Sequence, residues 1–492
     1  MKKVLILILA YNAEKHIVGV LKRLPDALWH NTEYSAEVVV IDDCSKDATT
    51  EVARQYVADI SYPVHLLRNP LNQGYGGNQK VGYTYAIKHG FDVVIMLHGD
   101  GQYPPEKIHD MVMPIIQGDA DAVFGSRIMV KKDALAGGMP LYKFMGNIAL
   151  TTVQNAMLGS NLSEFHSGFR AYSVAALKRI PFQHNSNVFH FDTDIIIQFV
   201  DNNFIIKEIP IPTFYGDEVC HVNGMRYALE VVLSTLLSRI QRFGIFYAPK
   251  FDYEKIVVYS DKSRFESSHS YSMAQVNAGE RVLDMGCGEG HVAMHLKARG
   301  CKIIGCDLVI SDATRSHLDV AILMDLNHPD FSAFDARSLD VVLLLDVIEQ
   351  LRAPEQFLAM LHTWCAETQT RIIITGSNIG FFIQRFMLLL GQFNYSKRGT
   401  LDMAHTRLFT FSSLRRTLEN AGFNIIDMQG LPAPFPLAIG EGWLASTLLK
   451  VNGWLIKLSR SLFSFQIAVV VKPRPTLEWL VEQAVAHGAK AK

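Results

Sequence analysis

The sequence predicts an α/β protein of two domains, each built around a mainly parallel sheet. The chain has 492 residues, and because a single hydrophobic core stops growing near about 250–300 residues, two cores are expected. Two series of short apolar runs alternate with amphipathic segments, which is the pattern of strand–helix–strand units. No internal repeat relates the two series, so we expect two different sheets.

The apolar runs place the strands and the domain boundaries. In the first series, strands are expected at 4–9, 38–41, 64–67, 93–97 and 122–124. In the second, they are expected at 281–284, 302–306, 321–324, 340–345, 371–375, 424–428 and 465–471. Between them, 244–275 contains Pro249 and a serine-rich run, which are typical of a linker. We therefore expect domains at 1–243 and 276–475, and a flexible tail at 476–492.

Composition excludes several classes of protein. The chain has 47 basic and 48 acidic residues, so no general electrostatic attraction to nucleic acid is expected. No stretch approaches the roughly 18 apolar residues of a transmembrane helix. The start, MKKVLILILA, is similar to a signal peptide, but a strand is favoured because the apolar run covers only seven residues. Six scattered cysteines favour reduced thiols, no disulfide and a cytoplasmic location.

Polar side chains follow two strands of the first series. Asp42 and Asp43 end the run VVVIDD, and Asp100 with Gln102 follows VVIML in the stretch HGDGQ. A nucleotide sugar carries a diphosphate leaving group, which an enzyme neutralises with a divalent cation. Hard oxygen ligands at a strand end suit Mg²⁺ or Mn²⁺. Taken alone, HGDGQ fits an ordinary β-turn equally well.

Six motifs in order give the first 230 residues a family resemblance. They are LAYNAEKHI at 9–17, VVVIDDCSKDATTEVA at 38–53, RNPLNQGYGGNQKVG at 68–82, HGDGQYPPE at 98–106, GSR at 125–127 and HSGFRAY at 166–172. This region resembles the inverting glycosyltransferase family 2, with its GT-A fold, and most closely its polyprenyl-phosphate sugar synthase branch. The resemblance implies a nucleotide-sugar site and a metal site. The implied nucleotide-sugar residues are Tyr11, Asn12, Asp42, Asp43 and Arg127, and the implied metal ligands are Asp100 and Gln102.

Two positions of this first site stay open. The family usually has an aspartate where His98 stands, so His98 is either a metal ligand or a structural turn residue. Glu164 is the candidate catalytic base, for an acceptor with a hydroxyl group. A lipid phosphate would need no base, because it is already ionised.

The second series opens with a glycine-rich turn. Gly286, Gly288 and Gly290 lie between a strand and a helix, Asp284 precedes them, and Asp307 ends the next strand. A nucleoside ligand needs such close backbone approach and a carboxylate for its ribose. His291 stands where a dinucleotide fingerprint has its last glycine, which argues against NAD.

Residues 268–472 resemble the class I methyltransferases, with LDVVLLLDVIEQL at 339–351 similar to their fourth strand. The resemblance implies S-adenosyl-L-methionine as cofactor. Asp284 and the three glycines would face its methionine part and Asp307 its ribose. Asp325 and Leu326 would face the adenine, and Asp346 the rim of the pocket.

The residue that accepts a proton during methyl transfer is the hardest feature to predict from the sequence. Relatives often carry histidine where Gln350 stands, and glutamine accepts no proton. His405 with Asp402 is the candidate catalytic pair, an imidazole oriented by a carboxylate. The alternative is that Asp402, His405 and Arg407 form a polar network that only fixes their loop.

Two further stretches, 381–395 and 443–463, are very apolar. The second places apolar residues at helical spacing with Lys450, Lys457 and Arg460 on the remainder, which suits a membrane surface or an acceptor lid. Packing in the core or as a cap is the favoured interpretation.

We therefore expect a bifunctional transferase that moves a sugar onto a glycan or polyprenyl-phosphate acceptor and O-methylates a related glycan. Peripheral association with the inner face of the membrane is an option. The alternative is a polyprenyl-phosphate sugar synthase whose second domain only binds S-adenosylmethionine or a partner. A scaffold of two decayed folds is disfavoured, because the expected acidic residues of both sites are present.

Overall fold

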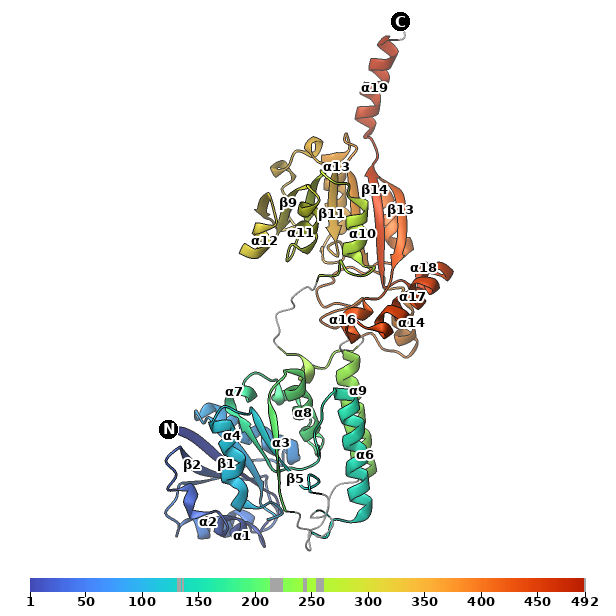
Figure 1. The fold of residues 1–492 in the computed structure, drawn as a ribbon. Coiled ribbons are helices and arrows are strands. Elements are labelled where there is room, and N and C mark those ends of the chain that lie inside the picture. Colours follow the sequence, from blue (N-terminus) through green and yellow to red (C-terminus); the bar gives the residue numbers. More distant parts are fainter. Residues whose placement is uncertain (131–133, 135–136, 213–223, 242–245, 254–260, 491–492) are drawn as a thin grey trace. The chain divides into compact units, whose positions relative to one another are not determined.

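The computed structural model describes residues 1–492 except 131–133, 135–136, 213–223, 242–245, 254–260 and 491–492 (Figure 1). The chain forms two compact units. The first contains residues 1–241 and 248–254, and the second contains residues 242–247 and 255–492.

The first unit is built on a seven-stranded sheet with the order β3-β2-β1-β4-β6-β5-β7. β6 is antiparallel to both of its neighbours, and the other pairs are parallel. The strands are β1 (Lys2–Ala10), β2 (Tyr34–Asp42), β3 (Val64–Arg68), β4 (Val93–His98), β5 (Ala122–Ser126), β6 (Arg170–Ser173) and β7 (Ile206–Pro210). β1 lies near the centre of the sheet and is fully apolar from Val4 to Ala10, as expected for a strand covered on both faces.

Helices pack on both faces of this sheet and form two apolar cores. They are α1 (Ile17–Lys22), α2 (Thr49–Val57), α3 (Gly74–Lys88), α4 (Ile108–Ile116), α6 (Leu141–Leu158), α7 (Val174–Leu177), α8 (Phe191–Asp201) and α9 (Gly224–Gln241). α6 and α9 lie side by side (Figure 1).

The second unit is built on another seven-stranded sheet, with the order β10-β9-β8-β11-β12-β14-β13. Only β14 runs antiparallel to its neighbours. The strands are β8 (Arg281–Met285), β9 (Lys302–Asp307), β10 (Val320–Leu323), β11 (Val341–Leu345), β12 (Arg371–Ser377), β13 (Phe423–Leu431) and β14 (Gln466–Pro473). All twelve strands expected from the sequence are confirmed, and β6 and β7 are additional.

The helices of the second unit fall into two groups. Those that cover the sheet are α10 (Ser268–Gln275), α11 (His291–Ala298), α12 (Asp312–Ser316), α13 (Pro354–Cys365) and α15 (Phe411–Asn420). Those that follow β12 or β13 as inserts, or end the chain, are α14 (Phe382–Leu389), α16 (Phe435–Ile439), α17 (Trp443–Leu458), α18 (Arg460–Phe463) and α19 (Leu477–Lys490).

Two segments expected to lack regular structure contain helices. α10 falls inside the expected linker because Ser267 and Ser270 form a capping box, and Tyr271 is buried in the core of the second unit. Serines that resemble a linker by composition are therefore helix caps. The expected tail contains α19, on which Leu477 and Val481 are exposed.

No helix in the described part of the chain has the length and apolarity needed to cross a membrane. The cysteines at 44, 287, 301, 306 and 365, which lie in that part, carry free thiols.

Candidate active sites

The carboxyl ends of β1, β2 and β4 bring the predicted residues of the first site together. Ala10 pairs with Asp42, and Leu9 pairs with His98. The amide of Asp43 donates to the Ala10 carbonyl at 2.9 Å, and the amide of Gly99 donates to the Leu9 carbonyl at 2.7 Å. The loops that carry Tyr11, Asp43 and Asp100 therefore leave the same edge of the sheet.

Asp42 is buried, and its carboxylate accepts hydrogen bonds from donors of its own loop. Its carboxylate accepts the Ser45 amide at 3.0 Å and the hydroxyl groups of Ser45 and Thr50. The Arg68 guanidinium lies 3.5 Å away. These bonds fix the turn between β2 and α2.

Asp43 is also buried, and it fixes the start of α3. Its carboxylate accepts the amides of Gln73 at 2.8 Å and Gly74 at 2.9 Å, and the Asn69 side chain at 2.7 Å. Gly74 has a φ of +77°, and a Cβ there would lie 2.6 Å from the Asn187 carbonyl. The two aspartates thus shape the loops around the site, and their roles toward a nucleotide stay predictions.

Tyr11 and Asn12 form the turn after β1. Asn12 adopts a left-handed φ of 51°. Its amide donates to Ser45 Oγ at 2.9 Å, and its side-chain oxygen accepts the Lys46 amide at 3.0 Å. The Tyr11 side chain is exposed beside this turn, where it is free to contact a ligand.

Asp100 lies in a tight turn at the end of β4. One carboxylate oxygen accepts the Gln102 amide at 3.0 Å, and the residue is partly exposed. Across the described residues, no three His, Cys, Asp or Glu side chains are grouped to hold a metal ion by themselves. A cation at Asp100 would therefore take its remaining ligands from substrate phosphates and water, as Mg²⁺ commonly does.

His98 is enclosed by aromatic rings. Tyr75 and Tyr103 contact it edge-on, with ring centroids 5.4 and 4.9 Å away. Among the described residues its buried Nε2 has no hydrogen-bond partner, and a Cβ on Gly168 would lie 2.8 Å from it. Burial lowers the pKa of His98, although Asp100 and Asp192 oppose the shift. This packing favours the structural alternative over the metal-ligand one.

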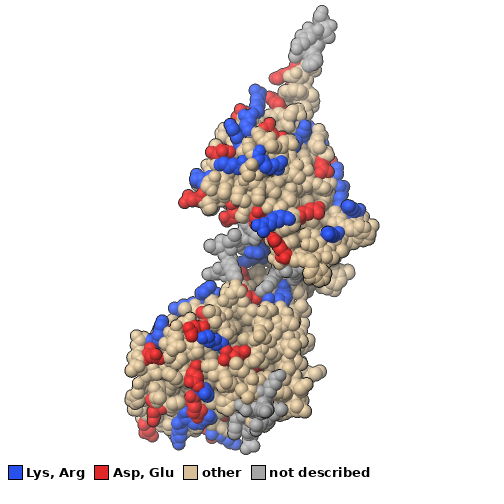
Figure 2. All heavy atoms as spheres, viewed as in Figure 1, with Lys and Arg blue, Asp and Glu red and all other residues tan. Residues whose placement is uncertain are grey.

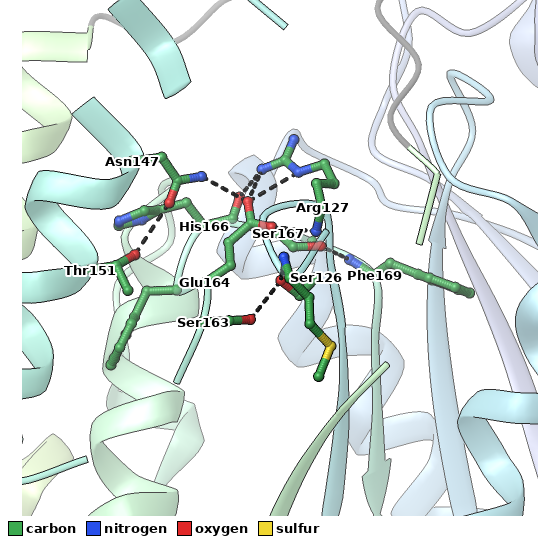
Figure 3. Close-up of polar contacts among 12 residues, drawn as sticks. Ser126, Arg127, Asn147, Thr151, Ser163, Glu164, His166, Ser167 and Phe169 are labelled. Atoms are coloured by element: carbon green, nitrogen blue, oxygen red, sulfur yellow. Dashed lines mark hydrogen bonds and ion pairs between the residues drawn. The ribbon is translucent and has the colours of Figure 1, made fainter. Parts of the chain in front are cut away.

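Glu164 and Arg127 form a buried ion pair (Figure 3). Glu164 accepts the Arg127 amide at 2.7 Å, the Arg127 Nε at 3.0 Å and Asn147 Nδ2 at 2.8 Å. Burial would raise the pKa of Glu164, but the charge of Arg127 and these hydrogen bonds outweigh it and hold the pKa below its usual value. A carboxylate that accepts these hydrogen bonds and pairs with a guanidinium is a weak proton acceptor. The geometry therefore indicates a positioning role for Glu164.

Two further groups lie beside this pair, and one of them was not found from the sequence. Arg127 Nη2 donates to the His166 carbonyl at 3.0 Å, and His166 Nδ1 lies 2.9 Å from the Tyr227 hydroxyl on α9. Burial lowers the pKa of His166 to about 4, so the ring is neutral. The motif HSGFRAY had marked His166, but Tyr227 lies in a helix with no motif.

In the second unit, the glycine turn after β8 adopts a backbone conformation that favours glycine. Gly286, Gly288 and Gly290 have φ values of +86°, +50° and +73°. A Cβ on Gly286 would lie 2.4 Å from Val347 Cγ2, whereas one on Gly288 would meet no atom of the described residues within 4 Å. Gly288 therefore faces open space, as a residue that a ligand approaches closely must.

Asp284 and Asp307 lie on either side of this turn. The Gly288 amide donates to Asp307 at 2.9 Å. Burial, together with the charge of Asp307, raises the pKa of Asp284 to about 7. A buried carboxylate with this raised pKa suits a cationic ligand, which would stabilise its charged form.

The remaining predicted residues lie at the same edge of the sheet. Leu326 is within 3.9 Å of the position of a Cβ on Gly286. The Asp325 carboxylate accepts the Asn327 amide at 2.8 Å. Asp346, at a φ of 57°, accepts Thr375 Oγ1 at 2.8 Å and Gln466 Nε2 at 2.7 Å, and lies 3.4 Å from Lys262 Nζ.

His405 has a different carboxylate neighbour from the one expected. The Asp402 carboxylate accepts the Ala404 amide at 2.9 Å, and it makes no described bond to the His405 ring. Instead, His405 Nε2 lies 3.8 Å from Glu349 Oε1, and Nδ1 lies 3.3 Å from the Thr400 carbonyl. A turn at 402–405 directs the Asp402 carboxylate to the backbone, from where its charge opposes the lowering of the His405 pKa by burial, so the orientation of His405 by Asp402 stays a prediction.

Glu349 is the residue of this site that sequence reasoning missed. It is buried, and it accepts the Ser377 amide at 2.9 Å, while its Oε2 has no hydrogen-bond partner among the described residues. Burial, together with the charge of Asp346, raises the pKa of Glu349 to about 8. It directly precedes Gln350, whose exposed side chain donates to the Asp346 carbonyl at 2.8 Å.

Comparison with known proteins agrees with this division. Residues 5–181 match the family described as Glycosyl transferase family 2, and residues 258–428 match one described as Methyltransferase domain. An uncharacterized protein of Methanocaldococcus jannaschii is 31% identical over 215 residues, which are 44% of this chain and 83% of the relative.

Two named relatives match the same 44% of the chain at 29% identity. A UDP-N-acetylglucosamine–dolichyl-phosphate N-acetylglucosaminyltransferase of Methanococcus voltae is covered over 87% of its length. An undecaprenyl-phosphate mannosyltransferase of Micrococcus luteus is covered over 85%. The chain is therefore a transferase that belongs to glycosyl transferase family 2 through its first unit and carries a methyltransferase domain in its second.

Proposed function

We propose that the first unit transfers a sugar from a nucleotide sugar to a polyprenyl phosphate, and that the second methylates a glycan-related acceptor with S-adenosylmethionine. The relatives named above act on dolichyl and undecaprenyl phosphates, which supports the lipid acceptor. The enzyme would then work as a peripheral protein at the cytoplasmic face of a membrane.

One observation on the first unit supports the proposal of a lipid acceptor. α6 and α9 expose many apolar residues although several of their polar ones are buried, unlike an ordinary surface helix. The buried polar residues are Thr151, Gln154, Ser234, Thr235 and Ser238, beside the buried apolar Phe144, Leu158 and Val231, and the exposed apolar residues include Leu141, Tyr142, Met145, Met225, Leu229 and Leu233.

The same two helices reach the candidate site. Asn147 of α6 bonds to Glu164, and Tyr227 of α9 bonds to His166. An apolar surface that leads to the Arg127–Glu164 pair suits an acceptor with a long hydrocarbon chain and an anionic head. Such an acceptor needs no catalytic base. This agrees with the ion pair that holds Glu164 against Arg127.

For sugar transfer, Asp100 would hold Mg²⁺ or Mn²⁺ with Gln102 beside it, and Arg127 would contact the donor phosphates. A bound cation would neutralise the leaving diphosphate. Tyr11, Asn12 and the loops fixed by Asp42 and Asp43 would hold the nucleoside.

For methyl transfer, His405 would be the proton acceptor, with the Glu349 carboxyl group 3.8 Å from its Nε2. The Thr400 carbonyl needs a donor, which favours the tautomer with its proton on Nδ1 and leaves the Nε2 lone pair available. Asp284, Asp307, Asp325, Leu326, Asp346 and the three glycines would hold the cofactor.

The test is transfer of labelled sugar from a panel of nucleotide sugars to polyprenyl phosphate with Mn²⁺, and of labelled methyl from S-adenosylmethionine to the extracted glycolipid. A lipid product in the first assay and a methylated glycan in the second are expected. Transfer only to water-soluble acceptors would contradict the lipid acceptor.

A second candidate keeps sugar transfer and gives the second unit only a binding role. The Gln350 side chain, which accepts no proton, favours it. Calorimetry that detects S-adenosylmethionine binding, with no methyl transfer to any extracted glycan, would establish this candidate.

A further inference from the structure

Helix α17 presents its apolar face outward. It buries Ala445 and Asn452 and exposes Trp443 (80%) and Trp454 (66%). Residues 443 and 454 are three turns apart and so lie on one face of the helix. The favoured expectation that 443–463 packs in the core is wrong for this face.

The opposite side of α17, on which Leu448, Leu449 and Ile456 are partly buried, attaches it to the rest of the second unit. Asn452 Oδ1 accepts the Ala433 amide at 2.9 Å, and Asn452 Nδ2 donates to the Phe463 carbonyl at 2.9 Å. The helix is therefore held by specific hydrogen bonds in the orientation that exposes both tryptophans.

Helix α14 also exposes large apolar residues. It buries Met387 and Gln384, whose Nε2 donates to Thr400 Oγ1 at 2.7 Å, and it exposes Phe386 (58%) and Leu389 (81%). Leu390 and Phe393, which follow, are exposed as well.

α14 and α17 are joined through α18. The rings of Phe382 and Phe463 lie 5.9 Å apart, and Arg385 Nη2 donates to Ser461 Oγ at 3.1 Å. We call the surface formed by α14, α17 and α18 the insert surface. Soluble proteins rarely leave an apolar patch that spans several helices exposed unless it has a binding partner.

The charge of the insert surface has one sign. Neither 380–401 nor 442–473, the segments that contain it, has an aspartate or glutamate. Lys450 and Lys457 are exposed on α17, and their helical positions place them directly beside the tryptophan face. In Figure 2 the surface around these helices is mostly uncharged, with basic atoms beside it.

We propose that the insert surface binds an anionic lipid bilayer, with Trp443, Trp454, Phe386 and Leu389 at the level of the headgroups and Lys450 and Lys457 against lipid phosphates. Exposed aromatic and aliphatic residues flanked by lysines, without acids, are the composition of helices that lie in a membrane interface. The inference rests on the second unit alone and goes beyond the lipid acceptor proposed for the first.

The test measures tryptophan quenching in the full chain by vesicles of brominated phosphatidylcholine and phosphatidylglycerol. Strong quenching is expected, and W443F/W454F should remove most of it. The matched control is W479F, which changes a tryptophan on α19 and should leave the quenching in place. Both substitutions are at exposed or half-exposed positions, so folding should be unaffected.

A second variant tests the charge. K450E/K457E should weaken binding to vesicles with phosphatidylglycerol by about 10- to 30-fold, with little change on neutral vesicles. Because vesicle binding needs neither donor nor cofactor, D100N and G288A should bind as the wild type does. A failure of the transferase assays would thus be distinguishable from a failure of this proposal.

Three outcomes would overturn the proposal. One is quenching that survives W443F/W454F, and another is the absence of vesicle association. The third is a dimer of the free protein that W443F/W454F dissociates while vesicles cause no quenching, because the insert surface would then bind a second copy of the chain.

Discussion

Glu164 in the first unit and Glu349 in the second are both buried glutamates at the edge of a sheet, yet their pKa values shift in opposite directions. Glu164 has the Arg127 guanidinium against it, and its pKa is lowered. Glu349 has a backbone amide and a neutral imidazole, and its pKa is raised to about 8. The partner, rather than burial, decides the charge state.

The contrast extends to the two sites. In the first site, donors within the protein already satisfy the carboxylates of Asp42, Asp43 and Glu164. The site is therefore formed before any ligand binds. In the second, Asp284 and Glu349 are buried carboxylates with raised pKa values. A cationic ligand such as a sulfonium would supply the charge that they lack. Substitutions in the first site should therefore change the stability of the fold, whereas ligand binding in the second site should depend on pH.

The largest expected effect separates the two sites. Asp100→Asn should lower sugar transfer at least about 100-fold, because a metal ion supplies several kcal/mol of transition-state stabilisation, and it should leave methyl transfer unchanged. Both rates are measured on the same preparation. The control is Asp110→Asn, which removes an exposed ion pair with Lys107 and should affect neither. Loss of both activities in D100N would refute independent sites.

Glu164→Gln should destabilise the first unit by about 3–5 kcal/mol, because it breaks the buried ion pair with Arg127. Denaturant unfolding measures the change. The control is Glu106→Gln, which breaks an exposed pair with Arg23 and should cost no more than about 1 kcal/mol. A stable E164Q enzyme that has lost transfer would instead identify Glu164 as a catalytic base.

The glycine turn offers a matched pair of substitutions. Gly288→Ala and Gly300→Ala both place a Cβ at positive φ in open space, so each should cost about 1–2 kcal/mol of stability. Only Gly288 lies in the candidate cofactor turn. Calorimetry should show S-adenosylmethionine binding lost in G288A and retained in G300A. Equal binding by both would place the cofactor elsewhere.

Cofactor affinity should depend on pH through Asp284. Its pKa is raised to about 7 in the free protein, and a bound cation would favour the charged form, so binding should tighten as the pH rises from 6 to 8. The slope should approach tenfold per pH unit below the pKa. Asp284→Asn should bind more weakly and without this dependence. A wild-type affinity that is flat from pH 6 to 8 would contradict this role.

The fold and most of the strand-end residues could be predicted because both depend on local patterns. Apolar runs and glycine turns specify strands and their ends, and all twelve expected strands are present. Asp42, Asp43, Asp100, Asp284 and Asp307 were placed at the correct edges for the same reason.

The pairings could not be predicted, because they join residues that are distant in sequence. Glu349 and His405 are brought together by the return of the chain after α14, and Tyr227 reaches His166 from another helix. The outward face of α17 was missed for a related reason. Helical spacing locates the apolar stripe, but only Asn452 and its partners show which side is attached to the protein.

The smallest expected effect concerns stability and pH. Glu349 has a folded pKa of about 8 and an ordinary unfolded value near 4.5. The folded protein therefore holds a proton that the unfolded chain has released between these values, and stability is lost as the pH rises through this window. Glu349→Gln keeps an acceptor for the Ser377 amide but does not titrate. Its melting temperature should match that of the wild type near pH 5 and exceed it by a few degrees at pH 8 to 9, as measured by calorimetry. A difference in melting temperature that is the same at every pH would mean that folding does not raise the pKa of Glu349.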